Sequence, residues 1–570
     1  MPPQQFASLD AALKAHATRQ PDAQVLLFVA ADGSASGLTC ASLNDRALRI
    51  AQGLVQRGLG PGEVIVLLLP HSPDLVAAFW GGIYARALPA ILPYPAASVT
   101  PETQRAQLTT LARRAPVHHL LTTPEVRRNL DPVAAGVQCT VHDLESLLPT
   151  GDGPVDPLQT PAAPRSSAYV QFSSGTTGPQ KGIVLGHAAV LNNIRAITQA
   201  VELRAEDVVV SWLPLHHDMG LVSGVLLPIV TGNLAVLISP LDWVKDPGLL
   251  FRAIHEHRAS ICWMPNFAFN HCVNGLRESE RSHLHLESMR AFYNASEPVR
   301  LDSLDLFYEH FHPAGLRRSA LGTSYGMAEV TAAVTISAPG QAAPVDWVSI
   351  DSLQRERQAV AQAPRAAGAM PLVSSGRPVA GVEVRIVDEQ GSTLPERHVG
   401  EILVLSNACM SSFLPALDTP SATAWVRSGD LGYLAQGELF VTGRIKDLII
   451  SGGRNIHPED IEAQAQGVPQ LRPGRAAAFG VEDPASGTEQ IVLVCETRSP
   501  LAPHDYWAVV RELRHRTQQS LAVALADVRL VEPGWIIKTS SGKIARSANR
   551  EKYLSMISTS GGAQEAGHAP

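Results

Sequence analysis

A run of hydroxyl and glycine residues that ends near a lysine is the part of the sequence best suited to chemistry. The run covers residues 173–182 and reads SSGTTGPQKG. Such a chain can turn sharply and aim several N–H groups and hydroxyls at one point, which suits a polyphosphate, and the lysine adds a positive charge. The residues expected to hold phosphate are Ser173, Ser174, Gly175, Thr176, Thr177 and Lys181. No hydroxyl follows the lysine, so the G-x-x-x-x-G-K-[ST] loop of the common nucleotide hydrolases is excluded, and a flexible surface loop is the alternative.

Two histidines and an aspartate follow a predicted strand over residues 207–213. Adjacent side chains on an extended chain diverge, and no third metal ligand is spaced near His216, His217 and Asp218. The pattern therefore favours a single histidine oriented toward a ligand over a metal site.

Residues 322–326 read GTSYG and match the G-x-S-x-G elbow of the α/β hydrolases. The elbow requires an apolar strand before the serine, but residues 316–321 read LRRSAL. Acidic residues and histidines occur downstream, so the order of a catalytic triad is not excluded. A hydrolase would nevertheless leave the phosphate-type run without a role, which disfavours this interpretation.

The composition is that of an ordinary globular protein, and the length predicts more than one domain. The chain has 570 residues, of which 45% are hydrophobic and 17% charged, and its net charge is −7. This length exceeds what one core usually supports, and this charge gives no reason to expect nucleic acid or a membrane as partner. The six cysteines form no C-x-x-C pair, so they predict neither a disulfide framework nor a zinc site. Without a signal peptide or membrane span, we expect a cytoplasmic enzyme that acts on small molecules.

Strand and helix patterns alternate around the phosphate-type run. Strands are predicted over residues 24–29, 64–69, 168–172, 382–387 and 400–405, and helices over residues 9–16, 41–57, 72–86 and 188–200. This alternation predicts an α/β fold with a mostly parallel sheet, and the run itself is expected between a strand and a helix. Residues 88–97 are predicted to be a Pro-rich loop. The apolar segment 259–269 fits a core strand or the wall of a ligand pocket equally well.

The C-terminal part carries a second set of Gly-rich turns. Residues 339–371 change in composition toward Ala, Gln, Arg and Pro, resemble an insertion, and contain a possible helix over residues 348–360. Residues 451–455 read SGGRN, and Pro458 then begins a predicted acidic helix. Residues 538–544 read KTSSGKI, a lysine-bearing loop that would make sense if it swings into a site, or otherwise a solvated basic turn.

Six motifs in one order identify a resemblance to the adenylate-forming superfamily, which includes acyl-CoA synthetases, nonribosomal peptide adenylation domains and firefly luciferase. They are SSGTTGPQKG, LPLHHDMG, NASEP, SYGMAEVT, RSGDLG with GRIKDLI, and KTSSGKI. The resemblance covers residues 5–550. It is greatest to the fatty acyl-AMP ligases, because of SPLDWVKDP, PNFAFNHC and the insertion with VSIDSLQRERQAV. In those ligases the insertion is thought to hamper the domain arrangement that acyl-CoA formation requires.

The resemblance implies a domain organisation. It predicts a large N-terminal domain of layered α/β sheets with a β-barrel-like subdomain over residues 1–443. A hinge at residues 444–447, centred on Lys446, would lead to a small mobile α+β domain over residues 448–556. Residues 557–570 are expected to be a disordered tail.

The resemblance also implies a reaction in two halves, with ATP and Mg²⁺. A carboxylic acid attacks the α-phosphate to give an acyl adenylate and pyrophosphate, and the phosphopantetheine thiol of an acyl carrier protein then takes the acyl group. Two alternatives remain: an acyl-CoA ligase that uses free CoA, and a catalytically silent binding protein of the same fold. The presence of Lys543 and Glu329 disfavours the silent protein.

Each motif receives a role by this resemblance. Lys543 would bridge the carboxylate and the α-phosphate, Glu329 would bind Mg²⁺, and Lys181 would contact the phosphates. Asp430, with Arg444, would bind the ribose. Tyr325 would stack on adenine, with Ala295, Ser296 and Glu297 on its other side, and Ser324, Gly326 and Met327 would also bind ATP. His217 would orient the carboxylate, and the acyl pocket would consist of His217, Trp263, Met264 and Asn266. Trp263 and Met264 replace smaller residues of the subgroup, which predicts a narrow tunnel and a medium-chain fatty acid.

Overall fold

The structure is a computed structural model that describes residues 6–94, 109, 117–134, 139–147, 166–172, 181–414, 424–483, 488–539 and 542–561. Residues 173–180 lie outside this part. The predicted phosphate contacts of Ser173, Ser174, Gly175, Thr176 and Thr177 are therefore not described.

A nine-stranded sheet forms the centre of the large unit, and six of its strands are parallel. From one edge to the other it contains β17 (Arg377–Pro378), β14 (Ala333–Ile336), β13 (Leu321–Gly326), β12 (Ala291–Ala295), β11 (Ile261–Pro265), β9 (Val208–Ser211), β10 (Leu234–Ile238), β1 (Gln24–Val29) and β2 (Ala35–Thr39). The strands from β13 to β1 pair in parallel, and β2, β14 and β17 are antiparallel at the two ends. The inner strands are apolar and buried on both faces, as a parallel sheet covered by helices requires. The predicted α/β class with a mostly parallel sheet is confirmed.

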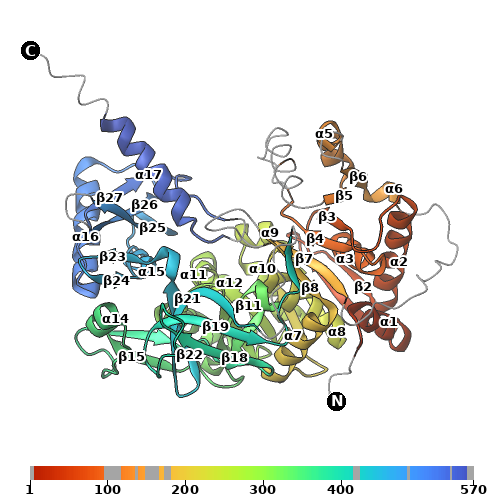
Figure 1. Ribbon diagram of the computed structural model, residues 1–570, viewed down its shortest axis with the longest axis horizontal. Helices are drawn as coiled ribbons and strands as arrows, with labels where there is room; N and C mark the ends of the chain where they lie inside the picture. Colours follow the sequence, from red (N-terminus) through yellow and green to blue (C-terminus); the bar gives the residue numbers. More distant parts are fainter. Residues whose placement is uncertain are drawn as a thin grey trace, which may run out of the picture.

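A second sheet lies at the end of the molecule opposite the C-terminal unit (Figure 1). It consists of β4 (Leu88–Ile91), β3 (Val64–Leu68), β5 (Val117–Thr122) and β6 (Thr140–Asp143), all parallel. The Pro-rich loop predicted from residue 88 is therefore wrong at its start, where β4 forms. Proline is tolerated there because β4 is the end strand of this sheet, where the missing N–H breaks no ladder.

The phosphate-type run connects two antiparallel strands. The strand before it is β7 (Ser167–Phe172), as predicted, but β8 (Gly182–Gly186) intervenes before α7 (His187–Ala200). β8 also pairs with β20 (Ser412–Leu414). The strand–loop–helix expectation missed β8, whose Ile183, Val184 and Leu185 are buried between its neighbours.

Helices fill the space around the sheets. Those of the large unit are α1 (Leu9–Arg19), α2 (Cys40–Gln56), α3 (Pro73–Tyr84), α5 (Pro124–Ala134), α6 (Leu144–Leu147), α7, α8 (Leu227–Thr231), α9 (Pro240–Lys245), α10 (Gly248–His257), α11 (Asn266–Gly275), α12 (Glu278–Arg281) and α13 (Leu301–Phe311). Local signals explain several starts: Ser8 accepts a hydrogen bond from Ala11 N, and Thr39 and Ser42 form a capping box.

An antiparallel sheet completes the large unit. It contains β18 (Val382–Val387), β19 (Gly400–Ser406), β21 (Val426–Ala435) and β22 (Glu438–Arg444). The segment predicted as an insertion forms β15 (Val345–Ser349), α14 (Ile350–Glu356) and β16 (Ala369–Val373). β15 pairs with β16, so α14 is carried on a small hairpin-like element.

Residues 448–561, which we call the C-terminal unit, build hydrophobic clusters of their own. Its elements are β23 (Ile449–Ser451), β24 (Arg454–Ile456), α15 (Pro458–Ala463), β25 (Leu471–Asp483), β26 (Thr488–Thr497), α16 (Pro503–Leu521), β27 (Asp527–Val531) and α17 (Arg546–Gly561). A disordered tail was expected from residue 557, but α17 continues to Gly561. In the described part of the chain, no helix combines the length and apolar character needed to cross a membrane.

Candidate active site

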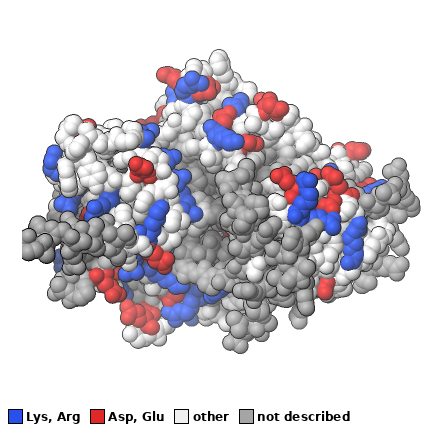
Figure 2. All heavy atoms as spheres, turned by 90° about the horizontal axis from the view of Figure 1, so that it is seen from above, with Lys and Arg blue, Asp and Glu red and all other residues white. Residues whose placement is uncertain are grey.

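One cavity of about 1780 Å³ is lined by residues of both the large unit and the C-terminal unit. Seen from above, the surface is hollowed between them (Figure 2). The residues predicted from sequence that line the cavity are Lys181, His217, Trp263, Asn266, Ala295, Ser296, Glu297, Ser324, Tyr325, Gly326, Met327, Glu329, Asp430, Arg444, Lys446 and Lys543. Those from His217 to Met327 lie at or just after the carboxyl ends of the parallel strands β9, β11, β12 and β13, where α/β sheets bind ligands. The others come from the antiparallel strands, the loops beside them and the C-terminal unit.

A tyrosine, an aspartate and an arginine form a fixed network on one wall. The Tyr325 hydroxyl at the end of β13 donates to Asp430 Oδ2 at 2.8 Å, and Arg444 Nε lies 3.0 Å from Asp430 Oδ1. Asp430 and Arg444 are paired across β21 and β22. Burial and the Asp430 charge hold the pKa of Tyr325 well above its usual value, so the tyrosine stays a neutral donor. The carboxylate is thereby oriented before any ligand binds.

Strand β13 runs through Ser324 without a sharp turn. It covers Leu321–Gly326, and Ser324 is buried within it. A nucleophile elbow places its serine on a tight strand-to-helix turn, and this geometry is different. The structure thus supports the preference against a hydrolase.

Glu329 is held beside a strained residue. It lies on the 3₁₀ turn η4 (Ala328–Val330), and Thr331, the residue after this turn, has φ 74° and ψ −65°, the values of a rare classic γ-turn. Thr331 is fully buried, and its hydroxyl donates to Ala408 O at 2.8 Å. Burial, with the charges of Asp218 and Asp430, raises the pKa of Glu329. A cation here would relieve this excess of negative charge. The sequence offered no signal for the strain at Thr331.

The histidine–aspartate segment leads directly into the π-helix η1 (Met219–Leu226), a geometry frequent at functional sites. His217 Nδ1 lies 2.6 Å from Asp218 Oδ1, and Met219 N donates to the same oxygen at 2.7 Å. Burial raises the pKa of Asp218, but His217 and these hydrogen bonds more than offset it and lower the pKa overall. Because Nδ1 contacts Asp218, Nε2 is the ring nitrogen of His217 that could contact a ligand. Among the described residues, no group of three His, Cys, Asp or Glu side chains could hold a metal ion.

Lys543 reaches this cavity from the C-terminal unit. Its turn is closed by hydrogen bonds from Thr539 N to Lys543 O at 2.8 Å and from Gly542 N to Thr539 O at 2.9 Å. Burial and the Arg444 charge lower the pKa of Lys543, and the charges of Glu297, Asp218 and Asp430 act against this. The ammonium therefore lies in the field of several carboxylates of the large unit.

Another part of the cavity is aromatic. The Trp263 ring lines it and stacks on Tyr293, with ring centroids 5.1 Å apart. Met264 follows on β11, has its side chain on the other face of the sheet, and is fully buried in the core. The structure therefore places Trp263, but not Met264, at the cavity wall. Residues 259–269 are not one strand, because β11 ends at Pro265 and α11 begins at Asn266.

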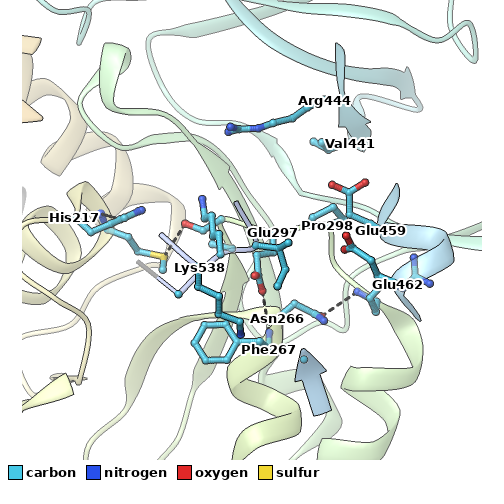
Figure 3. A pocket seen from close by; sticks show the side chains of 18 of the residues that line it. His217, Asn266, Phe267, Glu297, Pro298, Val441, Arg444, Glu459, Glu462 and Lys538 are labelled. Carbon is cyan, nitrogen blue, oxygen red and sulfur yellow. Dashed lines mark hydrogen bonds between the residues drawn. The ribbon is translucent and has the colours of Figure 1, made fainter. Parts of the chain in front are cut away.

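Asn266 lines the cavity but uses its amide to organise the surrounding chain. Its Oδ1 accepts from Asn294 Nδ2 at 2.9 Å and from Arg300 N at 3.1 Å, and its Nδ2 donates to Ser303 Oγ at 3.2 Å. Beside it, Phe267 N donates to Glu297 Oε2 at 2.9 Å (Figure 3). These bonds fix the loop after β12 against the start of α11.

Sequence reasoning missed two residues of the site. Lys538 lines the cavity with its Nζ 5.6 Å from the Phe267 ring centroid. Burial and the Arg475 charge lower the pKa of Lys538 to about 8. Lys538 was visible in KTSSGKI, but nothing in the sequence pointed to Phe267 as its partner.

The comparisons with known proteins agree with this geometry. Residues 13–414 match the family described as "AMP-binding enzyme". The long-chain-fatty-acid–AMP ligase FadD26 of Mycobacterium marinum is 32% identical, over 96% of this chain and 97% of its own length. The medium-chain-fatty-acid–[acyl-carrier-protein] ligase JamA of Moorena producens is 31% identical, over 91% of this chain and 90% of its own.

A solved structure from a study of fatty acyl-adenylate ligases from E. coli and L. pneumophila superposes with a TM-score of 0.89. It is 28% identical, and the match covers 97% of this chain and 99% of that chain. The chain therefore belongs to the family of AMP-binding enzymes and, with it, to the adenylate-forming superfamily that includes the fatty acyl-AMP ligases.

Proposed function

We propose that the protein is a fatty acyl-AMP ligase that converts a fatty acid and ATP to acyl-AMP and pyrophosphate. The observation that carries this proposal is the convergence of Lys543 with the Tyr325–Asp430–Arg444 network and Glu329 in one cavity. A nucleotide and an acid could bind there side by side. The names of the relatives FadD26 and JamA support the choice of a fatty acid.

The residues around the cavity divide the work of adenylation. The oriented Asp430 carboxylate accepts the ribose hydroxyls, and Tyr325 stacks on adenine, with residues 295–297 on its other side. The substrate carboxylate attacks the α-phosphate, an acyl–phosphate bond forms, and the bond to pyrophosphate breaks. Lys543 stabilises the charge that develops between the two anions, while His217 orients the carboxylate.

The run at residues 173–182 binds the phosphate end of ATP in this proposal. We assign the β- and γ-phosphates to Ser173, Ser174, Gly175, Thr176, Thr177 and Lys181. Of these, Lys181 lines the cavity. Its Nζ lies 5.2 Å from the Phe413 ring centroid on β20.

Glu329 fits Mg²⁺ as a cofactor. Mg²⁺ usually takes one or two protein carboxylates and completes its shell with phosphate oxygens and water. A single carboxylate in a negative surrounding matches this need. Bound at Glu329, the ion would neutralise phosphate charge.

We propose an acyl carrier protein as the acceptor. The insertion contacts the C-terminal unit directly: Asn455 Nδ2 donates to Gln354 O at 3.0 Å, and Arg454 donates to Gln354 Oε1. In this proposal the C-terminal unit turns about Lys446 between the two half-reactions. The contacts with the insertion support a restraint on that movement, and the restraint disfavours acyl transfer to free CoA. An acyl-CoA ligase is the second candidate, because a putative acyl-CoA synthetase of Caulobacter vibrioides is 31% identical over 91% of this chain.

A two-step assay tests these proposals. Hydroxamate trapping with ATP and a panel of acids should give adenylates, and the loaded enzyme should then acylate a phosphopantetheinylated carrier protein faster than free CoA. Absence of any adenylate rejects the ligase, and faster transfer to CoA selects the second candidate.

We further propose that the acid is a medium-chain fatty acid, because Trp263 narrows the aromatic end of the cavity. Replacing Trp263 by Ala should raise kcat/KM for longer acids, by about 4-fold for each methylene newly buried. Equal turnover of long and medium chains by the unaltered enzyme would contradict the proposal.

A further inference from the structure

The turn that carries Lys543 rests on one aromatic ring of the large unit. The Phe267 ring lies under Lys538, with Nζ 5.6 Å from its centroid. A Cβ built on Gly542 would lie 3.5 Å from Phe267 Cε1, so the ring faces the space beside Gly542 as well. Lys538 and Gly542 flank the closing hydrogen bonds of Thr539, and Gly542 has φ +86°, which favours glycine. One ring thus lies beside both Lys538 and Gly542, on the two sides of the Lys543 turn.

The ring itself is held rigidly. Its backbone N–H donates to Glu297, and its edge packs on Trp212 and Trp243, with centroids 6.1 and 6.3 Å away. The two tryptophans stack with centroids 3.4 Å apart, and both are buried. Phe267 therefore has little freedom to follow a moving turn.

A second contact anchors the same unit through charge. Arg300 Nη1 lies 2.7 Å from Asp460 Oδ1 on α15, with 25% and 13% of the two side chains exposed. Burial lowers the pKa of Arg300, but the Asp460 charge and those of nearby carboxylates more than offset it and raise the pKa overall. Arg300 N is bonded to Asn266, the neighbour of Phe267. The ring and the ion pair are therefore parts of one rigid surface.

We propose that Phe267 and Arg300 are positioning residues that seat the C-terminal unit so that Lys543 is aligned for adenylate formation. We call the Phe267 ring and the Arg300–Asp460 ion pair the seat of the C-terminal unit. Its positioning role rests on the proposed function. Neither residue takes part in the reaction. The ring fixes the position of the Lys543 turn relative to the large unit, and the ion pair fixes the orientation of α15. Both contacts must separate when the unit leaves this arrangement, so they act on the first half-reaction alone.

Half-reaction kinetics separate this role from a merely structural one. Phe267→Leu should lower kcat for ATP–pyrophosphate exchange by about 10- to 100-fold, as expected for a misplaced catalytic group, with KM for ATP little changed. Transfer from supplied acyl adenylate should change less than about 2-fold, and Phe267→Tyr should restore exchange. The matched control is Phe6→Leu, since Phe6 packs against His16, away from the cavity. An unchanged exchange rate, or equal loss in both halves, overturns the proposal.

A charge exchange tests the second contact. Arg300→Glu should slow exchange, and Arg300→Glu with Asp460→Arg should recover most of the loss. Arg318→Glu is the control, because Arg318 pairs with Asp305 within the large unit. Failure of the double variant to exceed Arg300→Glu contradicts the ion pair's role.

Hydrogen exchange reports on the seat without any substrate. Backbone amides of residues 538, 539 and 542–546 should exchange faster in Phe267→Leu than in Phe6→Leu and the unaltered protein. Equal exchange overturns the seat. If the unaltered protein shows no adenylation activity but Phe267→Leu still speeds hydrogen exchange at these amides, the proposed function is rejected and the structural contact is retained.

Discussion

At the scale of single residues, the active site depends on side chains whose charge is set by their neighbours. Asp430 is oriented by Tyr325 and Arg444, and Glu329 lies in the field of two aspartates. Lys543 is the only one of these groups that comes from the C-terminal unit. Under the proposed function, the chemistry would depend on a residue that the other unit supplies.

Replacing Lys543 by Ala should lower the rate of adenylate formation by about 10²- to 10³-fold, as removal of a donor to developing charge does elsewhere. Transfer of the acyl group from supplied acyl adenylate should remain near normal, because its carbonyl is already activated. Pyrophosphate exchange and carrier acylation measure the two halves. Equal losses in both would contradict the assignment.

The lowered pKa of Lys543 has a pH consequence. The lysine must be protonated to act on the two anions, so kcat/KM for adenylation should fall as the pH rises through its pKa, which lies below the ordinary 10.5. The Lys543→Arg variant, which keeps its charge, should lack this alkaline limb in its residual activity. The Lys538→Arg variant distinguishes the titration of Lys538 from that of Lys543. An unchanged alkaline limb in the Lys543→Arg variant would refute the prediction.

At the scale of elements, α14 and β24 form a contact that neither could provide alone. Gln354 is 5% exposed and meets both Arg454 and Asn455. The predicted insertion and the predicted Gly-rich turn thus become one interface.

Replacing Gln354 by Ala removes the side-chain bond to Arg454 and should speed transfer to free CoA by up to about 10-fold, the effect of one hydrogen bond. Adenylation should be unchanged. Arg277→Ala is the control, because Arg277 forms an exposed ion pair with Glu280 within the large unit. No gain in CoA transfer would show that this contact does not restrain the unit.

At the scale of the whole molecule, the cavity exists because two units meet, and Lys446 lies at their junction in the 3₁₀ turn η5 (Ile445–Asp447). Arg546 joins this junction to α15 through ion pairs with Asp447 and Glu459, each at 2.8 Å. Movement between half-reactions would concentrate backbone change at a few hinge residues.

Replacing Lys446 by Pro should preserve adenylation and slow transfer by about 10-fold or more, because proline fixes φ near its helical value and blocks the rotation. Single-turnover transfer from the preformed adenylate measures this. Equal slowing of both halves would argue against a hinge at this residue.

Local patterns predicted much of this fold. The apolar runs Gln24–Val29 and Val382–Val387 have the predicted limits, and α7 begins one residue earlier than expected. Such elements follow from neighbouring residues and their periodicity. β4 and β8 were missed because their pairing partners, and not their own sequences, make them strands.

The sequence by itself determined the class of fold, the order of the motifs and many of the residues that line the cavity, because short motifs carry side chains whose chemistry is local. Only the tertiary structure decided that Met264 turns away from the cavity, that Thr331 is strained, and that Phe267 meets the Lys543 turn. These features depend on contacts between segments up to hundreds of residues apart. Sequence spacing contains no information on such distances until the sheets and the two units are packed.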